Sequence, residues 1–348
     1  MVDKMIDWKA KRASKQPNTG LGLACTVHVS GKRHFGDYDG SSATIKINED
    51  GKALILSGEG ECGQGVHTAM CQIAAEELGV RVEDVEISRA DTDLTTFCLG
   101  AFASRLTYVS GNAVKNAAFN VKQQLFEQAG EMLEANPQDL MSRGGKIFVK
   151  GAEGKSITVA DVARARLFRH NGAPIVGSGS FDADSVLPDS TRFGNESGAY
   201  NYGAQAAHVH VDPETGQVKI LSFVVASDCG TVIYPIGAEG QVEGGLAQGI
   251  GYALTEGLQI DEGRPINPNF SDYRIPSMRD MPPLQHAFAD SYEPTGPFGA
   301  KGLGELNMDP TAAVINNAIF DAVGVRIKTL PITPEKILRA LRERTRHD

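Results

Sequence analysis

The sequence predicts an α+β fold made of two associated lobes, each containing strands and helices. Three observations support this prediction. Residues 43–57 and 204–230 each alternate apolar and polar residues around a turn, which is the pattern of a β-hairpin. Residues 110–135 and 309–323 place apolar residues three or four positions apart, which indicates helices in both halves. A segment at 171–203, rich in Gly, Asp and Ser, separates the halves.

The first 40 residues contain five glycines and no sustained hydrophobic period. We expect such a segment to pack across another surface and not to form the core of a domain. The hairpin at 43–57 turns at an Asp-Gly pair, which favours the left-handed angles of a tight turn. A helix at 66–78 follows, and Gly79 is expected to end it because glycine readily adopts a left-handed C-cap conformation.

A strand is predicted at 85–93, followed by the longest helix at 110–135. Ser110 is the expected N-cap of that helix, and an Asn-Pro pair ends it. The connector beyond it carries little periodic signal. We therefore place the lobe boundary there, with an N-terminal lobe at 1–185 and a C-terminal lobe at 186–348.

The second half begins with the hairpin at 204–230 and continues with a glycine-rich helix predicted at 240–257. Five glycines are expected to lie on one side of this helix: Gly240, Gly244, Gly245, Gly249 and Gly251. Each glycine costs a helix about 1 kcal/mol relative to alanine, so their number implies close contact with a bulky neighbour. An irregular, Pro-rich stretch at 264–298 and a last helix at 334–344 complete this half.

A glycine-rich loop within residues 296–324 ends at a single carboxylate, Glu305. Asp309 and Pro310 are predicted to start the next helix as N-cap and first-turn residue. The helix dipole would then favour the ionised form of Glu305, whereas burial beside Phe298 would favour the neutral form. A carboxylate under both influences could serve as a general base near neutral pH. A Glu that only accepts hydrogen bonds from the helix start is the alternative.

The composition argues against two classes of partner. The chain has 43 acidic and 34 basic residues, a net charge of −9, no Lys/Arg cluster and one Trp, so a nucleic-acid partner is not expected. No stretch approaches the roughly 20 apolar residues that span a bilayer, and the N-terminus lacks an apolar signal segment. We therefore expect a cytoplasmic protein without membrane contact, although a folded partner with its own signal could carry it across a membrane.

Side-chain metal ligands are not expected in this chain. Its five cysteines are odd in number and widely spaced, without a C-x-x-C pair, which argues against disulfides, zinc or an iron–sulfur cluster. His208 and His210 have the i, i+2 spacing of a metal pair on a strand, but no third ligand lies at a suitable spacing.

The stretch SGEGECGQGVHT at 57–68 satisfies the pattern G-x-G-x-x-G. Glu59 and Glu61 would repel a pyrophosphate, however, and the preceding strand belongs to a hairpin, so a dinucleotide fold is not indicated. What remains is a helix N-terminus at 64–68, whose backbone N–H groups and one amide could hold an anion or a cofactor.

Two other stretches each allow two interpretations. Ala103, Ser104 and Thr107 lie beside the start of the long helix, either as a capping loop or as part of a site. Gln241 and Gln248 are seven residues apart and fall on one face of the glycine-rich helix. Their amides could bind a flat, heteroatom-rich ring, or this face could be a helix-packing seam.

Several stretches taken together resemble one known family. They are GECGQGVHT, FASRLTYVSGNAV, DCGTVIYPIGAEGQVEGGLAQGIGY and GPFGAKGLGE, followed by GVRIKTLPITPEKIL. In this order they resemble the second molybdopterin-binding domain of the xanthine dehydrogenase and aldehyde oxidoreductase family of molybdenum hydroxylases. The resemblance covers nearly the whole chain.

The resemblance implies a molybdenum–molybdopterin cofactor, in its cytosine dinucleotide form, and hydroxylation of an electron-poor carbon with water as oxygen donor. The substrate would be an N-heterocycle such as nicotinate or a purine, or an aldehyde. In the family a glutamate takes the proton of a molybdenum-bound hydroxide, and by motif match that residue is Glu305. The motif positions also imply these cofactor-binding residues: Gln64, Gly65, Phe102, Ala103, Ser104, Thr107, Gln241, Gln248, Lys301 and Gly302.

The family's first molybdopterin domain, its cysteine-rich iron–sulfur modules and a flavin motif are not found in this sequence. The resemblance therefore implies a separate, smaller molybdenum subunit of the nicotinate dehydrogenase type. Its partners would be a larger molybdopterin subunit, a [2Fe-2S] subunit and an FAD subunit. Because Met1 lies close to the start of the resemblance, we expect an authentic short subunit. Two alternatives stay open, a 4-hydroxybenzoyl-CoA reductase-like subunit, which GPFGAK with SRLTY also resembles, and a non-catalytic cofactor carrier or assembly subunit.

Overall fold

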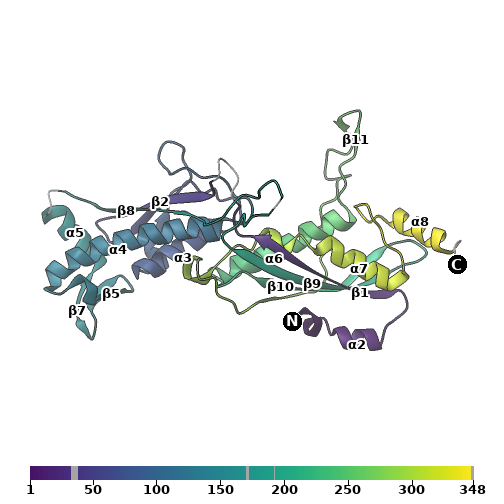
Figure 1. Ribbon diagram of the computed structural model, residues 1–348, viewed down its shortest axis with the longest axis horizontal. Coiled ribbons are helices and arrows are strands. Elements are labelled where there is room, and N and C mark those ends of the chain that lie inside the picture. The colour runs from purple at the N-terminus through teal and green to yellow at the C-terminus, as the bar shows by residue number, and fades with distance from the viewer. Residues whose placement is uncertain (33–37, 170–171, 192, 346–348) are drawn as a thin grey trace.

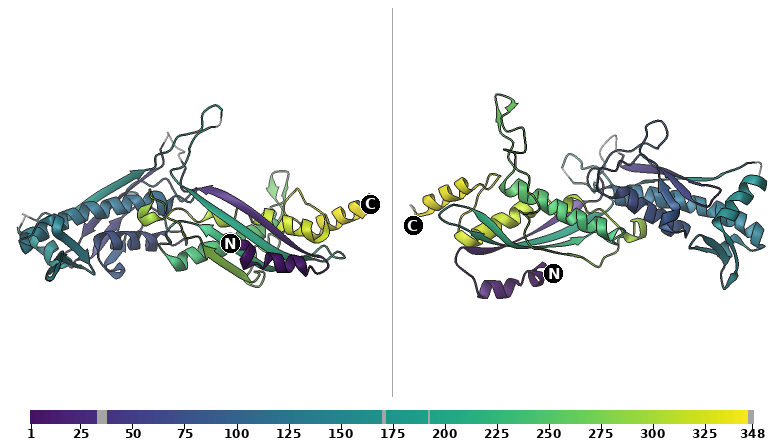
Figure 2. Two further views of the ribbon diagram at one scale, coloured as in Figure 1. Left: turned by 60° about the horizontal axis from the view of Figure 1, so that its bottom comes forward. Right: turned by 180° about the vertical axis from the view of Figure 1, so that it is seen from behind.

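The computed structural model describes residues 1–32, 38–169, 172–191 and 193–345. Two lobes lie end to end, and each contains a four-stranded sheet covered by helices (Figures 1 and 2). This arrangement agrees with the predicted α+β fold. No helix of the described segments is long and apolar enough to cross a membrane.

The first lobe is built on a sheet of strand order β4-β3-β2-β8. Its strands and its two main helices are β2 (Gly40–Ile47), β3 (Ala53–Leu56), β4 (Val85–Ile87), β8 (Ile175–Asp182), α3 (Val66–Leu78) and α4 (Gly111–Leu133). The predicted hairpin is the β2–β3 pair, and the predicted helix at 66–78 is confirmed with Gly79 in the left-handed C-cap. Strand β4 stops at Ile87 and does not reach residue 93 as predicted.

Strand β8 is the edge of this sheet, yet helix α4 lies directly against it. The side-chain amides of Asn116, Asn120 and Gln124 donate to the carbonyls of Ser180, Ser178 and Val176, at 2.9, 2.8 and 2.7 Å. The three amides are four residues apart on the helix, and the three carbonyls are two residues apart on the strand. One face of the helix therefore satisfies alternate carbonyls of the sheet edge.

A small subdomain completes the far end of the first lobe. A three-stranded antiparallel sheet is formed by β5 (Leu140–Arg143), β6 (Lys146–Val149) and β7 (Ala152–Thr158), and helix α5 (Val159–Arg169) follows it. Short 3₁₀ turns lie at Val82–Asp84 and Pro137–Asp139.

The second lobe has a sheet of strand order β1-β9-β10-β13. Its strands are β1 (Thr19–Val29), β9 (Tyr200–Val211), β10 (Val218–Asp228) and β13 (Leu284–Phe288). Helices α6 (Pro235–Leu254) and α7 (Thr311–Val323) pack on one face, and the short helices α1 (Val2–Met5) and α2 (Trp8–Ala13) lie at the other. Helix α8 (Pro334–Thr345) follows at the end of the lobe (Figure 1).

The N-terminal segment belongs to this second lobe. Strand β1 pairs with β9 along its whole length, from Thr19 opposite His210 to Val29 opposite Tyr200. Gly20 and Gly22 let β1 touch helix α7, since a Cβ at these positions would lie 2.1 and 2.0 Å from backbone oxygens of that helix. The glycine-rich start of the chain therefore packs across another surface, and that surface is the chain's own C-terminal half. The N-terminal lobe predicted at 1–185 thus includes β1, a strand that belongs to the sheet of the second lobe.

A long excursion between α6 and β13 projects from the second lobe (Figure 1). It contains a two-stranded hairpin, β11 (Ile260–Asp261) with β12 (Arg264–Pro265), and exposes several large apolar side chains. Exposed examples are Ile260, Ile266, Phe270 and Met278.

Three local predictions at helix starts are only partly confirmed. Ser110 stands at the predicted N-cap position of α4, but its side chain makes no capping hydrogen bond: a π-turn at Leu106–Ser110 runs straight into the helix, and the Ser110 hydroxyl donates to Glu59 at 2.7 Å. Asp309 does not cap α7, whose N-cap is Pro310. The glycine-rich helix begins at Pro235 and ends at Leu254, several residues before the predicted 240–257.

Candidate cofactor site between the lobes

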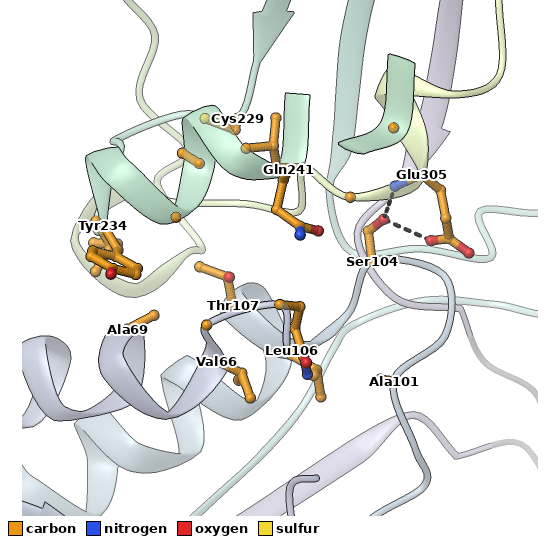
Figure 3. Close-up of a pocket in the computed structure, with 18 of the residues that line it drawn as sticks. Val66, Ala69, Ala101, Ser104, Leu106, Thr107, Cys229, Tyr234, Gln241 and Glu305 are labelled. Atoms are coloured by element: carbon orange, nitrogen blue, oxygen red, sulfur yellow. Dashed lines mark hydrogen bonds between the residues drawn. The ribbon is translucent and has the colours of Figure 1, made fainter. Parts of the chain in front are cut away.

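A cavity of about 420 Å³ lies where the two lobes meet, with walls from both of them (Figure 3). Eight of the eleven predicted site residues line it: Gln64, Gly65, Ser104, Thr107, Gln241, Gln248, Lys301 and Glu305. Phe102, Ala103 and Gly302 are not among the lining residues, although they adjoin Ser104 and Lys301 in the chain. Residues up to 241 positions apart in the sequence, Gln64 and Glu305, thus share one cavity.

The start of helix α3 is occupied by a carboxylate of the chain itself. Glu61 accepts backbone N–H bonds from Gly63, Gly65 and His67 at 2.8, 2.9 and 3.1 Å. Burial raises the pKa of Glu61, but these N–H bonds outweigh it, and the pKa lies below its ordinary value. The predicted anion site at this helix start is therefore already filled.

Gln64 is also engaged within its own loop. Its side-chain oxygen accepts from the Cys62 backbone N–H at 2.7 Å, and its amide nitrogen donates to the Gly60 carbonyl at 2.9 Å. Gln64 therefore stabilises the loop before α3.

Helix α6 presents free polar groups to the cavity. Gln241 and Gln248 make no hydrogen bond within the described parts of the chain, and their neighbour Gly244 has no atom within 4 Å of the place where a Cβ would stand. The other glycines differ: a Cβ at Gly245 would meet Asn307 at 2.8 Å, and one at Gly249 would meet Thr311 at 2.5 Å. One helix face thus packs on the 305–311 segment, and the other leaves room for a ligand.

The loop that leads to Glu305 is fixed by a buried lysine. Lys301 donates to Asp228 and to the Tyr200 carbonyl, both at 2.8 Å. Burial raises the pKa of Asp228, but the hydrogen bonds from Lys301 and Ser291 outweigh it, and the pKa is lowered. The Lys301 ammonium therefore anchors the loop. Phe298, expected beside Glu305, packs instead on the core of the first lobe.

Glu305 opens the short turn Glu305–Asn307 and its side chain is 47% exposed. The Ser104 hydroxyl donates to its Oε2 at 2.7 Å and accepts its backbone N–H at 3.1 Å (Figure 3). His28 Nε2 lies 3.8 Å from the same Oε2. Burial raises the pKa of Asp309, with His28 lowering it and Glu305 raising it further, so three titratable groups meet at this rim.

A buried ionic network supports the 102–107 loop, and the sequence analysis missed it. Arg105 is fully buried, bonds Asp39 at 2.8 Å and the Gly40 carbonyl at 2.7 Å, and lies 3.8 Å from Glu59. Its Nη1 has no hydrogen-bond partner among the residues that the structure describes. The signal was available in FASRLTYV, where a single arginine interrupts a run of small and apolar residues before a buried helix.

The Cys98 thiol also joins this network by donating to Glu59 at 2.7 Å. Burial and the Glu59 carboxylate raise the pKa of Cys98 to about 11. Burial likewise raises the pKa of Cys229, in the cavity wall, to about 11. The described residues contain no group of three or more His, Cys, Asp or Glu side chains that could hold a metal ion.

These features suit a flat, polar ligand. The amides of Gln241 and Gln248, which have no hydrogen-bond partner among the described residues, offer donors and acceptors to ring heteroatoms, and the open space at Gly244 admits a ring edge.

Comparison with known proteins agrees with this geometry. The profile of a family described as molybdopterin cofactor-binding domain matches residues 1–282. The 6-hydroxypseudooxynicotine dehydrogenase complex subunit gamma of Paenarthrobacter nicotinovorans is 35% identical over 91% of this chain and 39% of its own length. A putative xanthine dehydrogenase molybdenum-binding subunit of Escherichia coli K12 is 36% identical over 96% of this chain and 44% of its own length.

Solved structures show the same similarity. The quinoline 2-oxidoreductase from Pseudomonas putida 86 superposes with a TM-score of 0.85 and 30% identity, over 98% of this chain and 45% of that one. A reconstituted CO dehydrogenase from Oligotropha carboxidovorans gives a TM-score of 0.84 and 26% identity, over 99% of this chain and 43% of that one. The chain thus spans less than half the length of these relatives.

Proposed function

Because this chain belongs to the molybdopterin cofactor-binding family of the molybdenum hydroxylases, we propose that it is the cofactor-binding and base-supplying subunit of an enzyme that hydroxylates an electron-poor carbon. The observation that carries this proposal is Glu305 at the rim of a cavity that also holds the amides of Gln241 and Gln248, which have no partner in the described part of the chain. A protein that only carried the cofactor would not need a carboxylate fixed at that position.

We propose the cytosine dinucleotide form of the molybdenum cofactor. When bound, it supplies the redox centre that takes two electrons from the substrate. Gln241 and Gln248 would hold the heteroatoms of its ring system, with Thr107 on the opposite wall. Gln64 would contact it only by exchanging its bonds to Cys62 and Gly60.

Glu305 would take the proton from the water that provides the new oxygen of the product. Its Oε2 is held by the Ser104 hydroxyl, so the proton goes to Oε1. A general base positioned in this way contributes roughly 10² to 10⁴ in rate. The turn that carries Glu305 is fixed by Lys301 and by the packing of α6, so the base is placed before substrate arrives.

The substrate class we propose is an N-heterocycle such as nicotinate or a purine, or an aldehyde. Relatives named as nicotine 6-hydroxylase and xanthine dehydrogenase subunits support the heterocycle.

The partners we propose are a larger molybdopterin subunit, a [2Fe-2S] subunit and an FAD subunit, in a cytoplasmic complex. Relatives named as one subunit or chain of a complex support an assembly of several chains.

The test is Glu305→Gln in the assembled enzyme. The variant should keep normal molybdenum and iron content, because the amide preserves size and hydrogen bonding. Its rate of reduction by substrate should fall by about 10³-fold or more, near the upper end of what a general base contributes. Rapid-mixing kinetics at equal molybdenum content measure this rate.

Glu239→Gln is the matched control, since Glu239 lies on α6 outside the cavity lining. It should react at the wild-type rate. A Glu305→Gln enzyme that keeps more than about a tenth of the wild-type rate would rule out Glu305 as the base, because loss of a base costs more.

A further inference from the structure

The Ser104 hydroxyl makes two hydrogen bonds to Glu305, one to its side chain and one to its backbone. The Ser104 O–H donates to the carboxylate Oε2 at 2.7 Å, and the same oxygen accepts the Glu305 backbone N–H at 3.1 Å (Figure 3). The two residues are 201 positions apart and come from different lobes. The pair of bonds therefore fixes the carboxylate relative to its own backbone and relative to the first lobe.

The backbone that presents Ser104 is strained. Ala103 and Ser104 have φ angles of +50° and +52°, a left-handed conformation that side-chain-bearing residues rarely adopt. Each such residue is strained, because its Cβ comes too close to the backbone. A short loop does not hold two in succession unless its surroundings require it.

Two neighbours hold this conformation in place. The Gly31 backbone N–H donates to the Ala103 carbonyl at 2.7 Å, and Arg105, next to Ser104, is locked in its buried ionic network. Gly302 closes the other side, since a Cβ there would lie 2.4 Å from the Ser104 carbonyl oxygen. A glycine is therefore required at position 302, because a side chain there would push against the Ser104 loop.

The Ser104 hydroxyl has only one proton, and it is directed to Glu305. A ligand in the cavity could therefore use Ser104 only as an acceptor unless the bond to Glu305 breaks. Ser104 could donate a hydrogen bond to the cofactor only by giving up the hydrogen bond that it donates to Glu305.

Two other titratable groups face the same carboxylate. The His28 Nδ1–H donates to the Val29 carbonyl at 2.8 Å, so the free Nε2 faces Glu305 Oε2 at 3.8 Å. Asp309 follows on the same segment: burial raises its pKa, His28 lowers it, and Glu305 raises it further. Without Ser104, the carboxylate would be free to turn toward His28.

We infer that Ser104 is a positioning residue that holds Oε2 of Glu305 and so leaves Oε1 directed to the reacting water. This inference rests on the proposed function, in which Glu305 is the base. It predicts that loss of the hydroxyl lowers the rate of the proton-transfer step, and not the affinity for cofactor or substrate.

The chain contains a matched control for the same pair of bonds. The Thr158 hydroxyl donates to the Asp161 carboxylate at 2.6 Å and accepts the Asp161 backbone N–H at 3.1 Å. This pair lies at the start of α5, far from the cavity lining. Thr158→Ala removes an equivalent hydroxyl where no reaction takes place.

The experiment compares Ser104→Ala, Ser104→Gly and Thr158→Ala in the assembled enzyme, each alone, and the Ser104 variants also with Glu305→Gln. Glycine adopts the left-handed angles without strain, so Ser104→Gly removes the hydroxyl while relieving the loop. It remains informative if Ser104→Ala fails to assemble. The measurements are molybdenum content, melting temperature, substrate dissociation constant and the rate of the first reduction by substrate.

Both Ser104 variants should lower that rate by about 10- to 100-fold, as loss of a residue that orients a reacting group does. Molybdenum content and the substrate dissociation constant should not change, and Ser104→Gly should melt no lower than wild type. In the Glu305→Gln background the Ser104 replacements should change the rate by less than about twofold, because the two residues act as one unit. Thr158→Ala should keep the wild-type rate.

Three results would overturn the inference. They are a wild-type rate in both Ser104 variants, a loss of molybdenum with an unchanged rate per molybdenum, and a further full loss of rate in the Glu305→Gln background. The second result would make Ser104 a cofactor ligand only. Failure of the proposed function itself shows separately, as a Glu305→Gln enzyme that still turns over.

Discussion

At the scale of single residues, the cavity wall depends on a buried arginine that compensates two buried carboxylates. Arg105, Asp39 and Glu59 are each at most 1% exposed, and hydroxyls of Ser41 and Ser110 complete the shell of Glu59 at 2.6 and 2.7 Å. A buried charge is tolerated only with such partners. The left-handed loop at 103–104 is therefore attached to a rigid, buried ionic network.

We predict that Arg105→Ala lowers the free energy of unfolding by about 3 to 5 kcal/mol, because it leaves buried carboxylates without their guanidinium. The control is Arg81→Ala, which breaks an ion pair of an arginine that is 66% exposed. Such surface pairs contribute little to stability. Melting temperatures of the two variants measure the difference, and equal losses would show that the network is not needed for stability.

At the scale of elements, helix α6 has two faces with opposite requirements. Its Gly245 and Gly249 face the 305–311 segment, where no Cβ fits, and Gly244 faces open cavity. The sequence analysis predicted close packing for all five glycines from their cost to the helix. It could not separate the two faces, because the period of the glycines is the same whether the neighbour is protein or ligand.

We predict opposite results for two alanine substitutions in α6. Gly249→Ala should destabilise the fold by about 1 to 3 kcal/mol, since its Cβ would meet the buried Thr311 at 2.5 Å. Gly244→Ala should leave stability equal or raise it by up to about 1 kcal/mol, yet lower molybdenum content because the methyl group enters the cavity. Melting temperature and metal analysis test both, and full molybdenum content in Gly244→Ala would exclude a cofactor beside this residue.

At the scale of the whole molecule, two separate cores meet at a cavity that neither lobe could form alone. One core lies between the β2–β8 sheet and helices α3 and α4, and the other between the β1–β13 sheet and helices α6 and α7. Glu305 is half-exposed at the rim. The excursion around β11 projects from the second lobe (Figure 2) and exposes large apolar side chains. This surface is suited to contact with a further chain.

We predict that the chain produced alone aggregates or binds no molybdopterin, whereas co-production with a larger molybdopterin subunit yields a complex that contains molybdenum. The physical reason is that the cavity is open and the excursion leaves apolar surface in water. Size-exclusion chromatography with metal analysis measures both. A monodisperse monomer that loads molybdopterin without a partner would contradict the prediction.

The sequence by itself determined the local elements and the candidates for the site. The β2–β3 hairpin, the bounds of α3, the long helix α4 and the β9–β10 hairpin follow from periodicity and turn residues, since these depend on neighbours in the chain. The motif positions also predicted eight residues that line one cavity. Ser110 takes the predicted N-cap position but does not cap with its side chain, because its hydroxyl donates to the buried Glu59, and Asp309 lies one residue before the observed N-cap, Pro310.

Only the tertiary structure decided which distant residues meet. The contact of β1 with helix α7 explains Gly20 and Gly22, the filling of the α3 start by Glu61 removes an apparent anion site, and the bond of Ser104 to Glu305 joins the lobes. None of these contacts leaves a period or a spacing in the sequence. They arise because packing two cores against each other brings together segments whose separation along the chain carries no information about their distance in space.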